Sequence, residues 1–141
     1  MSVRIAVEAM KASRPFLLLL AFVAPAVAAQ EPNVAKVDAD GVQRVRIVGG
    51  SYVFKPNHIV VRVNVPVELL ASRESGITPH NLIVRAQDAG VVIEEDLGTD
   101  PKKIVFTATK VGKYPFYCGK KLPFMAGHRE KGMEGILEVV P

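Results

Sequence analysis

The sequence predicts an all-β domain, either a sandwich or a barrel. Three observations favour this fold class: apolar and polar residues alternate over short segments, turn residues separate these segments at regular spacing, and no long stretch has a helical period. Many short strands joined by regular turns are typical of sandwiches and barrels. The predicted strands lie at about residues 44–47, 52–54, 59–64, 66–71, 80–85, 91–93, 103–109, 112–118 and 135–140.

Alternation and glycine mark the first two strands. Val45 and Ile47 alternate with arginines, which predicts a strand with one buried face. Gly49 and Gly50 are expected to break this strand, and an apolar segment at 52–54 resumes it.

The later strands repeat the pattern. Residues 59–64 alternate apolar with polar, and residues 80–85 begin at His80 after a polar loop. We expect helix only as a short turn, within residues 94–98 or 119–126.

The first residues are typical of a secretory signal peptide. A basic start precedes an apolar run at 16–23 and then a series of small residues, and the run is too short to span a membrane. We expect residues 1–29 to be removed by cleavage near Ala28 or Ala29; an uncleaved membrane anchor is the alternative. The remaining domain, residues 30–141, would then be periplasmic and not stably inserted in the membrane.

Loss of the leader lowers the formal charge from +4 to about +2, because the leader holds three basic residues and one acidic residue. So small a positive balance gives no support to nucleic-acid binding. A domain of roughly 112 residues can bury about two-thirds of its surface, which is enough for a core without disulfides.

Cys118 is the single cysteine of the chain. Exported domains usually carry cysteines in pairs, so a lone thiol is either buried and inert or bound to a metal. Strand alternation places Tyr114, Phe116 and Cys118 on one face, and the two aromatics indicate that this face points into the core. Cys118 is therefore expected at the inner end of its strand.

Three further side chains complete a metal-ligand set with Cys118. His128 follows it by ten residues, Met133 follows His128 by five, and His80 begins a strand far upstream. Two imidazoles and one thiolate with a weak axial thioether are the ligands of blue-copper electron-transfer sites. We predict a metal site formed by His80, Cys118, His128 and Met133.

Motifs across residues 44–140 resemble those of one known family. They are Phe54-Lys-Pro56 running to Val63, Pro66-Val-Glu-Leu69, His80-Asn81, Gly112-x-Tyr114-x-Phe116-x-Cys118, and then His128 and Met133. On these motifs the chain resembles the cupredoxins, the small type 1 or blue copper proteins of bacteria. The resemblance implies a Greek-key β-sandwich of about seven to eight strands, with one copper ion cycling between Cu(I) and Cu(II) at one end. It also implies that Tyr114 is the corner tyrosine and that Asn81 braces the ligand loop beside the sulfur.

The ligand loop is longer than in most small cupredoxins. Nine residues separate Cys118 from His128, and the spacing of His128 and Met133 resembles the type 1 copper loop of copper nitrite reductases. Met125 also lies in this loop and competes with Met133 as axial ligand, but it precedes His128, so we favour Met133. His58 falls on the polar side of its strand, and we expect it to be exposed and not a ligand.

Ligand counting excludes several other metal sites. Structural zinc sites need four strong ligands, and the chain offers only three histidines and one cysteine. Catalytic copper sites need further histidines, and binuclear copper sites need a second cysteine; the chain has neither. We therefore expect one-electron transfer and no enzymatic activity. The alternative is a copper carrier that delivers the metal to another protein.

The loop also suggests how redox partners dock. An apolar segment at 122–125 lies next to His128, whose outer edge is the expected electron exit. Four basic residues surround it and would favour a redox partner with an acidic patch; these are Lys120, Lys121, Arg129 and Lys131. The segment could instead fold inward as a lid over the metal. We expect the protein to be a monomer.

Overall fold

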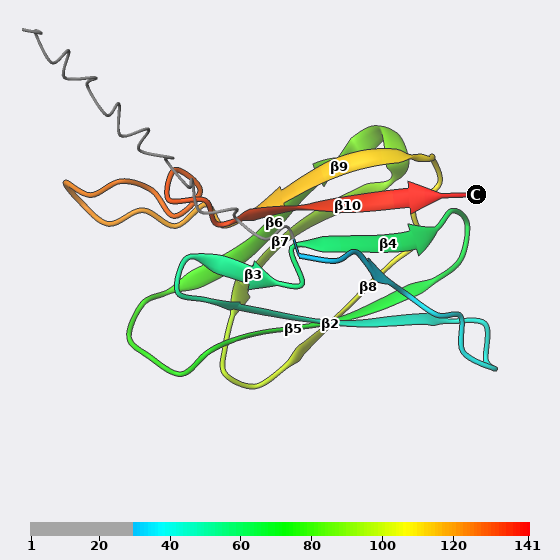
Figure 1. Cartoon of the computed structure of the whole chain (residues 1–141), viewed down its shortest axis with the longest axis horizontal. Coiled ribbons are helices and arrows are strands. Elements are labelled where there is room, and N and C mark those ends of the chain that lie inside the picture. Colours follow the sequence, from blue (N-terminus) through cyan, green and yellow to red (C-terminus); the bar gives the residue numbers. More distant parts are fainter. Residues whose placement is uncertain (1–29) are drawn as a thin grey trace, which may run out of the picture.

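The computed structural model describes residues 30–141, so the predicted leader, residues 1–29, lies outside the described residues. Within the described part, ten strands form two sheets (Figure 1). The strands are β1 (Asn33–Val34), β2 (Gln43–Gly50), β3 (Val53–Lys55), β4 (His58–Arg62), β5 (Val67–Arg73), β6 (His80–Ala86), β7 (Val91–Leu97), β8 (Lys102–Phe106), β9 (Gly112–Tyr117) and β10 (Glu134–Val140). No helix among the described residues is long and apolar enough to cross a membrane.

The two sheets pack face to face as a sandwich. One has the order β1-β4-β10-β9-β6-β7 and the other β3-β2-β5-β8. Most neighbours within a sheet are distant in sequence: β4 pairs with β10 and β2 with β5, both in parallel. The predicted all-β sandwich is confirmed.

The core between the sheets follows the sequence alternation. Along β2, Val45 and Ile47 are buried while the arginines between them are exposed. The rings of Phe54 and Phe116 meet edge to face across the core, with centroids 5.4 Å apart. Tyr114 donates its hydroxyl hydrogen to the carbonyl oxygen of Lys110, at 3.1 Å, as expected of a corner tyrosine.

Three details of the predicted secondary structure are wrong. Gly49 and Gly50 do not break the strand, because β2 continues through both and pairs with β3 and β5. No helical turn forms at 94–98 or 119–126: residues 94–97 extend β7 because they pair with β6, and the structure has only turns in 119–126. The chain forms a short 3₁₀ turn at Gln87–Ala89 instead. The described residues form ten strands rather than seven or eight, since short edge strands such as β1 add to the count.

Gly49 stays in the strand for a steric reason. A Cβ at this position would lie 3.0 Å from the terminal methyl group of Met133 and 3.3 Å from a methyl group of Leu97. The glycine therefore leaves room for the Met133 side chain at this end of the sandwich.

Replacing Gly135 by Ala is expected to destabilise the domain by about 3 kcal/mol or more, since overpacking a rigid site typically costs about 1–3 kcal/mol and this overlap is severe. A Cβ there would overlap both the backbone carbonyl oxygen of Asn57 and the ring of Phe116. Urea unfolding measures the effect. Gly98→Ala is the matched control, because its Cβ would meet nothing closer than 3.8 Å; equal stability of the two variants would contradict the packing described here.

Candidate metal centre

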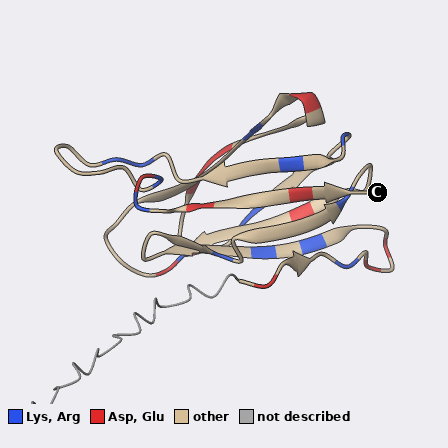
Figure 2. Cartoon of the chain, turned by 45° about the horizontal axis from the view of Figure 1, so that its top comes forward, with Lys and Arg blue, Asp and Glu red and all other residues tan. Residues whose placement is uncertain are grey.

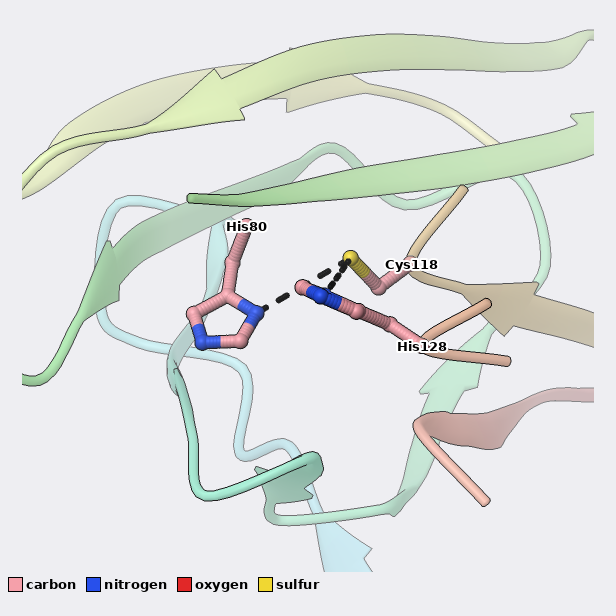
Figure 3. A group of neighbouring side chains, drawn as sticks. All are labelled: His80, Cys118 and His128. Carbon is pink, nitrogen blue, oxygen red and sulfur yellow. Dashed lines mark hydrogen bonds between the residues drawn. The ribbon is translucent and has the colours of Figure 1, made fainter. Parts of the chain in front are cut away.

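Three predicted ligands meet at one end of the sandwich (Figure 3). His80 is the first residue of β6, Cys118 directly follows β9, and His128 lies in the long loop that connects β9 to β10. The Cys118 Sγ lies 3.4 Å from the Nδ1 of His128 and 3.9 Å from the Nδ1 of His80. The three ligand atoms lie within 4.8 Å of one another, which lets them hold a single metal ion.

All three side chains are buried. Cys118 is fully buried, and the exposed fractions of His80 and His128 are only 5% and 2%. Burial lowers the pKa of both imidazoles, aided for His80 by the charge of His128 and for His128 by the charge of Lys131. Both rings therefore stay neutral, with a lone pair free for a metal, at neutral pH.

Asn81 links the ligand strands, as the resemblance to cupredoxins implies. Its backbone N–H points at the Cys118 sulfur over 3.5 Å, and its side-chain oxygen accepts a 2.7 Å hydrogen bond from the Gly119 N–H. The first contact holds the sulfur beside the start of β6. The second holds the start of the ligand loop against β6.

Hydrogen bonds also fold the long loop back on itself. The Cys118 N–H donates to the Met133 carbonyl over 3.0 Å, and the His128 N–H donates to the Lys120 carbonyl over 2.9 Å. The Met133 N–H donates to the His128 carbonyl over 3.0 Å, which closes the turn between these two residues. The nine residues that precede His128 in the loop therefore do not prevent it from reaching the thiol.

The two loop methionines lie in different environments. Met133 is fully buried and its methyl group packs toward Gly49, whereas Met125 has an exposed fraction of 47%. This placement is compatible with Met133 as the axial ligand, which remains a prediction. His58 lies outside the ligand group; it is half-buried rather than exposed, because its Nε2 contacts a Glu138 carboxylate oxygen at 2.8 Å.

Three features of the outer surface differ from the expectations. The edge of His128 is not an exposed electron exit, because the side chain is buried. In Figure 2 the end of the molecule with the long loop carries both basic and acidic segments. Three of the four basic residues form ion pairs within the chain: Lys120–Asp96 (2.6 Å), Lys121–Glu130 (3.9 Å) and Arg129–Glu134 (3.0 Å). The apolar segment does not fold inward as a lid, since Leu122, Phe124 and Met125 are all exposed.

No protein-family model matches the sequence, and no curated protein matches it either. Several solved structures are similar to this chain. One is the metal-binding domain of the Cu(I)-exporting P-type ATPase CopA of Streptococcus pneumoniae D39, with Cu(I); it has a TM-score of 0.58 and 22% identity, over 79% of this chain and 97% of that domain.

Two similar structures are auracyanins. Auracyanin A of Chloroflexus aurantiacus, described as a "blue" copper protein, has a TM-score of 0.55 and 22% identity, over 71% of this chain and 100% of that one. Reduced auracyanin of Roseiflexus castenholzii has a TM-score of 0.55 and 18% identity, over 70% and 97%. The chain has the cupredoxin fold. At these identities the likeness concerns the fold alone, and the site depends on this chain's own residues.

One residue at the centre, Tyr52, was not predicted from the sequence. Its ring lies edge to face with His128 at a centroid distance of 5.0 Å and with His80 at 6.4 Å. In the sequence it was only the first residue of the predicted strand 52–54. No local pattern indicated that the turn after Gly50 brings this ring to the two histidines.

Asn81→Ala is expected to destabilise the metal-free protein by about 1–3 kcal/mol, because it leaves the Gly119 N–H without its partner at a partly buried site. Urea denaturation monitored by circular dichroism measures the loss. Asn33→Ala is the matched control on the exposed strand β1, and it should change stability by less than about 0.5 kcal/mol. Similar losses in both variants would mean that Asn81 does not brace the loop.

Proposed function

We propose that this chain is an exported electron-transfer protein that carries one electron on a single copper ion. Cys118, His80 and His128 would hold the ion, with Met133 as axial ligand. The observation that carries the proposal is the buried thiol with the Nδ1 atoms of two buried imidazoles at 3.4 and 3.9 Å. Export to the periplasm is supported by the leader pattern of residues 1–29.

The donor set favours copper over zinc. A soft thiolate and two imidazoles, with a soft thioether as a fourth donor, match a blue-copper site, whereas structural zinc takes four strong ligands. Among the described residues the group that could hold a metal contains three such ligands, and His58 is engaged by Glu138 elsewhere. When bound, copper supplies the one-electron couple between Cu(I) and Cu(II).

The residues of this chain would keep the ligand geometry constant while the electron moves. His80 is the first residue of β6, and Cys118 directly follows β9, which pairs with β6. Asn81 and the backbone of the loop fasten Gly119, Cys118 and Met133. A rigid ligand set needs little rearrangement between oxidation states, which suits electron transfer. Catalytic copper sites need more histidines than this ligand group contains, which is why we propose that the protein is not an enzyme.

A redox partner would dock on the end of the molecule that carries the long loop. In Figure 1 this loop projects beyond the strands, at the end opposite the C-terminus. Phe124 and Ile77 are fully exposed there, and Leu122 and Met125 are partly exposed. A depression of about 450 Å³ is lined by Cys118, His128 and other residues of the ligand loop, and it brings solvent close to the site. Such an apolar surface suits brief contacts; an acidic patch on the partner would use the remaining basic charge.

A copper carrier is the second candidate. It is favoured by the likeness to a domain of a Cu(I) exporter and by the exposed side chain of Met125 in the ligand loop. A carrier would hold Cu(I) and pass it on, so its loaded form would be colourless.

Optical titration of the protein without its leader separates the two. We expect Cu(II) to produce an intense visible absorption that disappears on reduction and returns on reoxidation. A colourless Cu(I) complex that loses its metal to an acceptor protein would favour the carrier. Absence of any copper binding would refute both.

A further inference from the structure

The ring of Tyr52 contacts both histidines of the metal centre. It lies edge to face with His128, at 5.0 Å and an interplanar angle of 79°, and with His80, at 6.4 Å and 85°. The two imidazoles are themselves 5.0 Å apart. Edge-to-face rings at these distances attract one another. One tyrosine ring can therefore hold in place the imidazoles of His80 and His128, which come from separate segments of the chain.

The backbone presents Tyr52 in an unfavourable conformation. Ser51 and Tyr52 form the two-residue turn between the paired residues Gly50 and Val53, and both have positive φ, 50° and 59°. Turns of this type prefer Asn and Gly, and a bulky residue with positive φ is disfavoured. Such a residue persists where its surroundings hold it, and strained residues gather at functional sites. For Tyr52 these surroundings are the two histidines.

Lys131 adds a contact from the ligand loop. Its ammonium group lies 4.1 Å from the centroid of the Tyr52 ring, a cation–π distance. The backbone N–H of Lys131 donates to the His128 carbonyl over 3.1 Å. The β2–β3 turn and the ligand loop are therefore joined at the tyrosine ring.

Solvent approaches the centre closely from two sides. A depression of about 180 Å³ is lined by His80 and Ser51, and the depression of about 450 Å³ is lined by Cys118 and His128. Even so, the ligands are at most 5% exposed. The side chains that cover them therefore decide how easily water or a reagent reaches the thiol.

We propose that Tyr52 is a positioning residue of the metal centre: its ring, held by the β2–β3 turn and by Lys131, fixes the imidazoles of His80 and His128. Those imidazoles lie 3.9 and 3.4 Å from the Cys118 sulfur, so holding them in place also limits access to the thiol. This inference rests on the proposed function only in taking these residues as the metal ligands. Tyr52 acts through the two histidines and needs no contact with the metal itself.

Two substitutions at one position separate the ring from the turn. Tyr52→Phe keeps the ring, whereas Tyr52→Asn removes it but suits the positive φ, so the turn is retained. In the metal-free protein, N-ethylmaleimide reports on access to the only thiol. We expect Tyr52→Asn to react about three- to tenfold faster than wild type, the range that the loss of ring pairs implies, and Tyr52→Phe to stay within about twofold.

Two further variants serve as controls. Ser51→Asn changes the same turn and leaves the ring, so its rate should equal that of wild type. Lys131→Gln removes the cation over the ring without touching the turn, and we expect it to react about twofold faster. This variant also keeps the proposal testable if Tyr52→Asn fails to fold. Equal rates in wild type, Tyr52→Asn and Lys131→Gln would overturn the proposal, as would an acceleration in Tyr52→Phe as large as in Tyr52→Asn.

The copper-loaded protein provides a second readout. Tyr52→Asn should shift the visible absorption band and the Cu(II) electron paramagnetic resonance spectrum, and Tyr52→Phe should leave both unchanged. If the wild-type protein shows no visible band, the proposed function fails, while the thiol reaction still decides the role of Tyr52. A visible band that is identical in all variants, together with equal thiol rates, would leave the proposed function intact and refute the role of Tyr52.

Discussion

Copper-loaded Cys118→Ser is expected to lose its intense visible absorption completely. That absorption would arise from charge transfer between a thiolate and Cu(II), and Cys118 is the only thiol in the chain. Its sulfur lies closest to the His128 Nδ1, at 3.4 Å, in the middle of the buried group. A serine hydroxyl is a hard donor that stays protonated at neutral pH, so it cannot replace the thiolate.

The thermal stability of the same variant provides the control. A ligand that binds only the folded state stabilises it by about 4 kcal/mol at a free concentration of about 1,000 times its Kd. Copper should therefore raise the Tm of the wild-type protein clearly and that of Cys118→Ser little. The metal-free variant should remain folded, since a serine hydroxyl has the same connectivity as the thiol and can accept the hydrogen bond of the Asn81 N–H. If the colour survives in Cys118→Ser, the site is wrongly assigned.

Met133→Ala is expected to destabilise the metal-free protein by about 2–5 kcal/mol, the usual cost of a cavity left by a large buried side chain. Met133 is fully buried, and its methyl group fills the space that Gly49 leaves open. Met125→Ala is the matched control in the same loop; because Met125 is exposed, its replacement should cost less than about 0.5 kcal/mol. Urea unfolding of both variants measures the difference.

A leucine substitution separates packing from metal binding at the same positions. Met133→Leu nearly conserves volume and should cost less than about 1.5 kcal/mol, yet it removes the thioether. If Met133 is the axial ligand, the reduction potential and the visible spectrum will change in Met133→Leu and stay constant in Met125→Leu. A spectrum that changes only in Met125→Leu would reverse the assignment of the axial ligand.

Much of the fold and most of the candidate site could be predicted from local patterns. Alternation along β2 and β9 showed which residues are buried, because side chains of a strand point to opposite faces in turn. The ligand types could be predicted because a lone cysteine in a chain that is predicted to be exported needs a reason. Local patterns misjudged Gly49 and Gly50 as a break, since the demand for glycine comes from Met133 and Glu74 on other elements.

The long loop illustrates the other limit of local patterns. Its basic residues suggested a positive rim, but three of the four pair with acids: Asp96 on β7, Glu130 in the same loop and Glu134 at the start of β10. Whether His128 reaches the surface depends on what covers it, and burial by other elements is invisible to sequence spacing. The ion pairs of the loop and the burial of His128 both depend on segments that folding brings together.

The sequence by itself determined the all-β class, and it named Cys118, His80 and His128, because alternation and ligand chemistry are carried by residues close in the chain or unique in it. Only the tertiary structure decided that these three atoms lie within 4.8 Å, that Met133 is inside and Met125 outside, and that Tyr52 contacts both imidazoles. The physical reason is that each of these facts depends on distances between strands of different sheets and loops. Those distances are set by packing the whole core, and no local pattern encodes them.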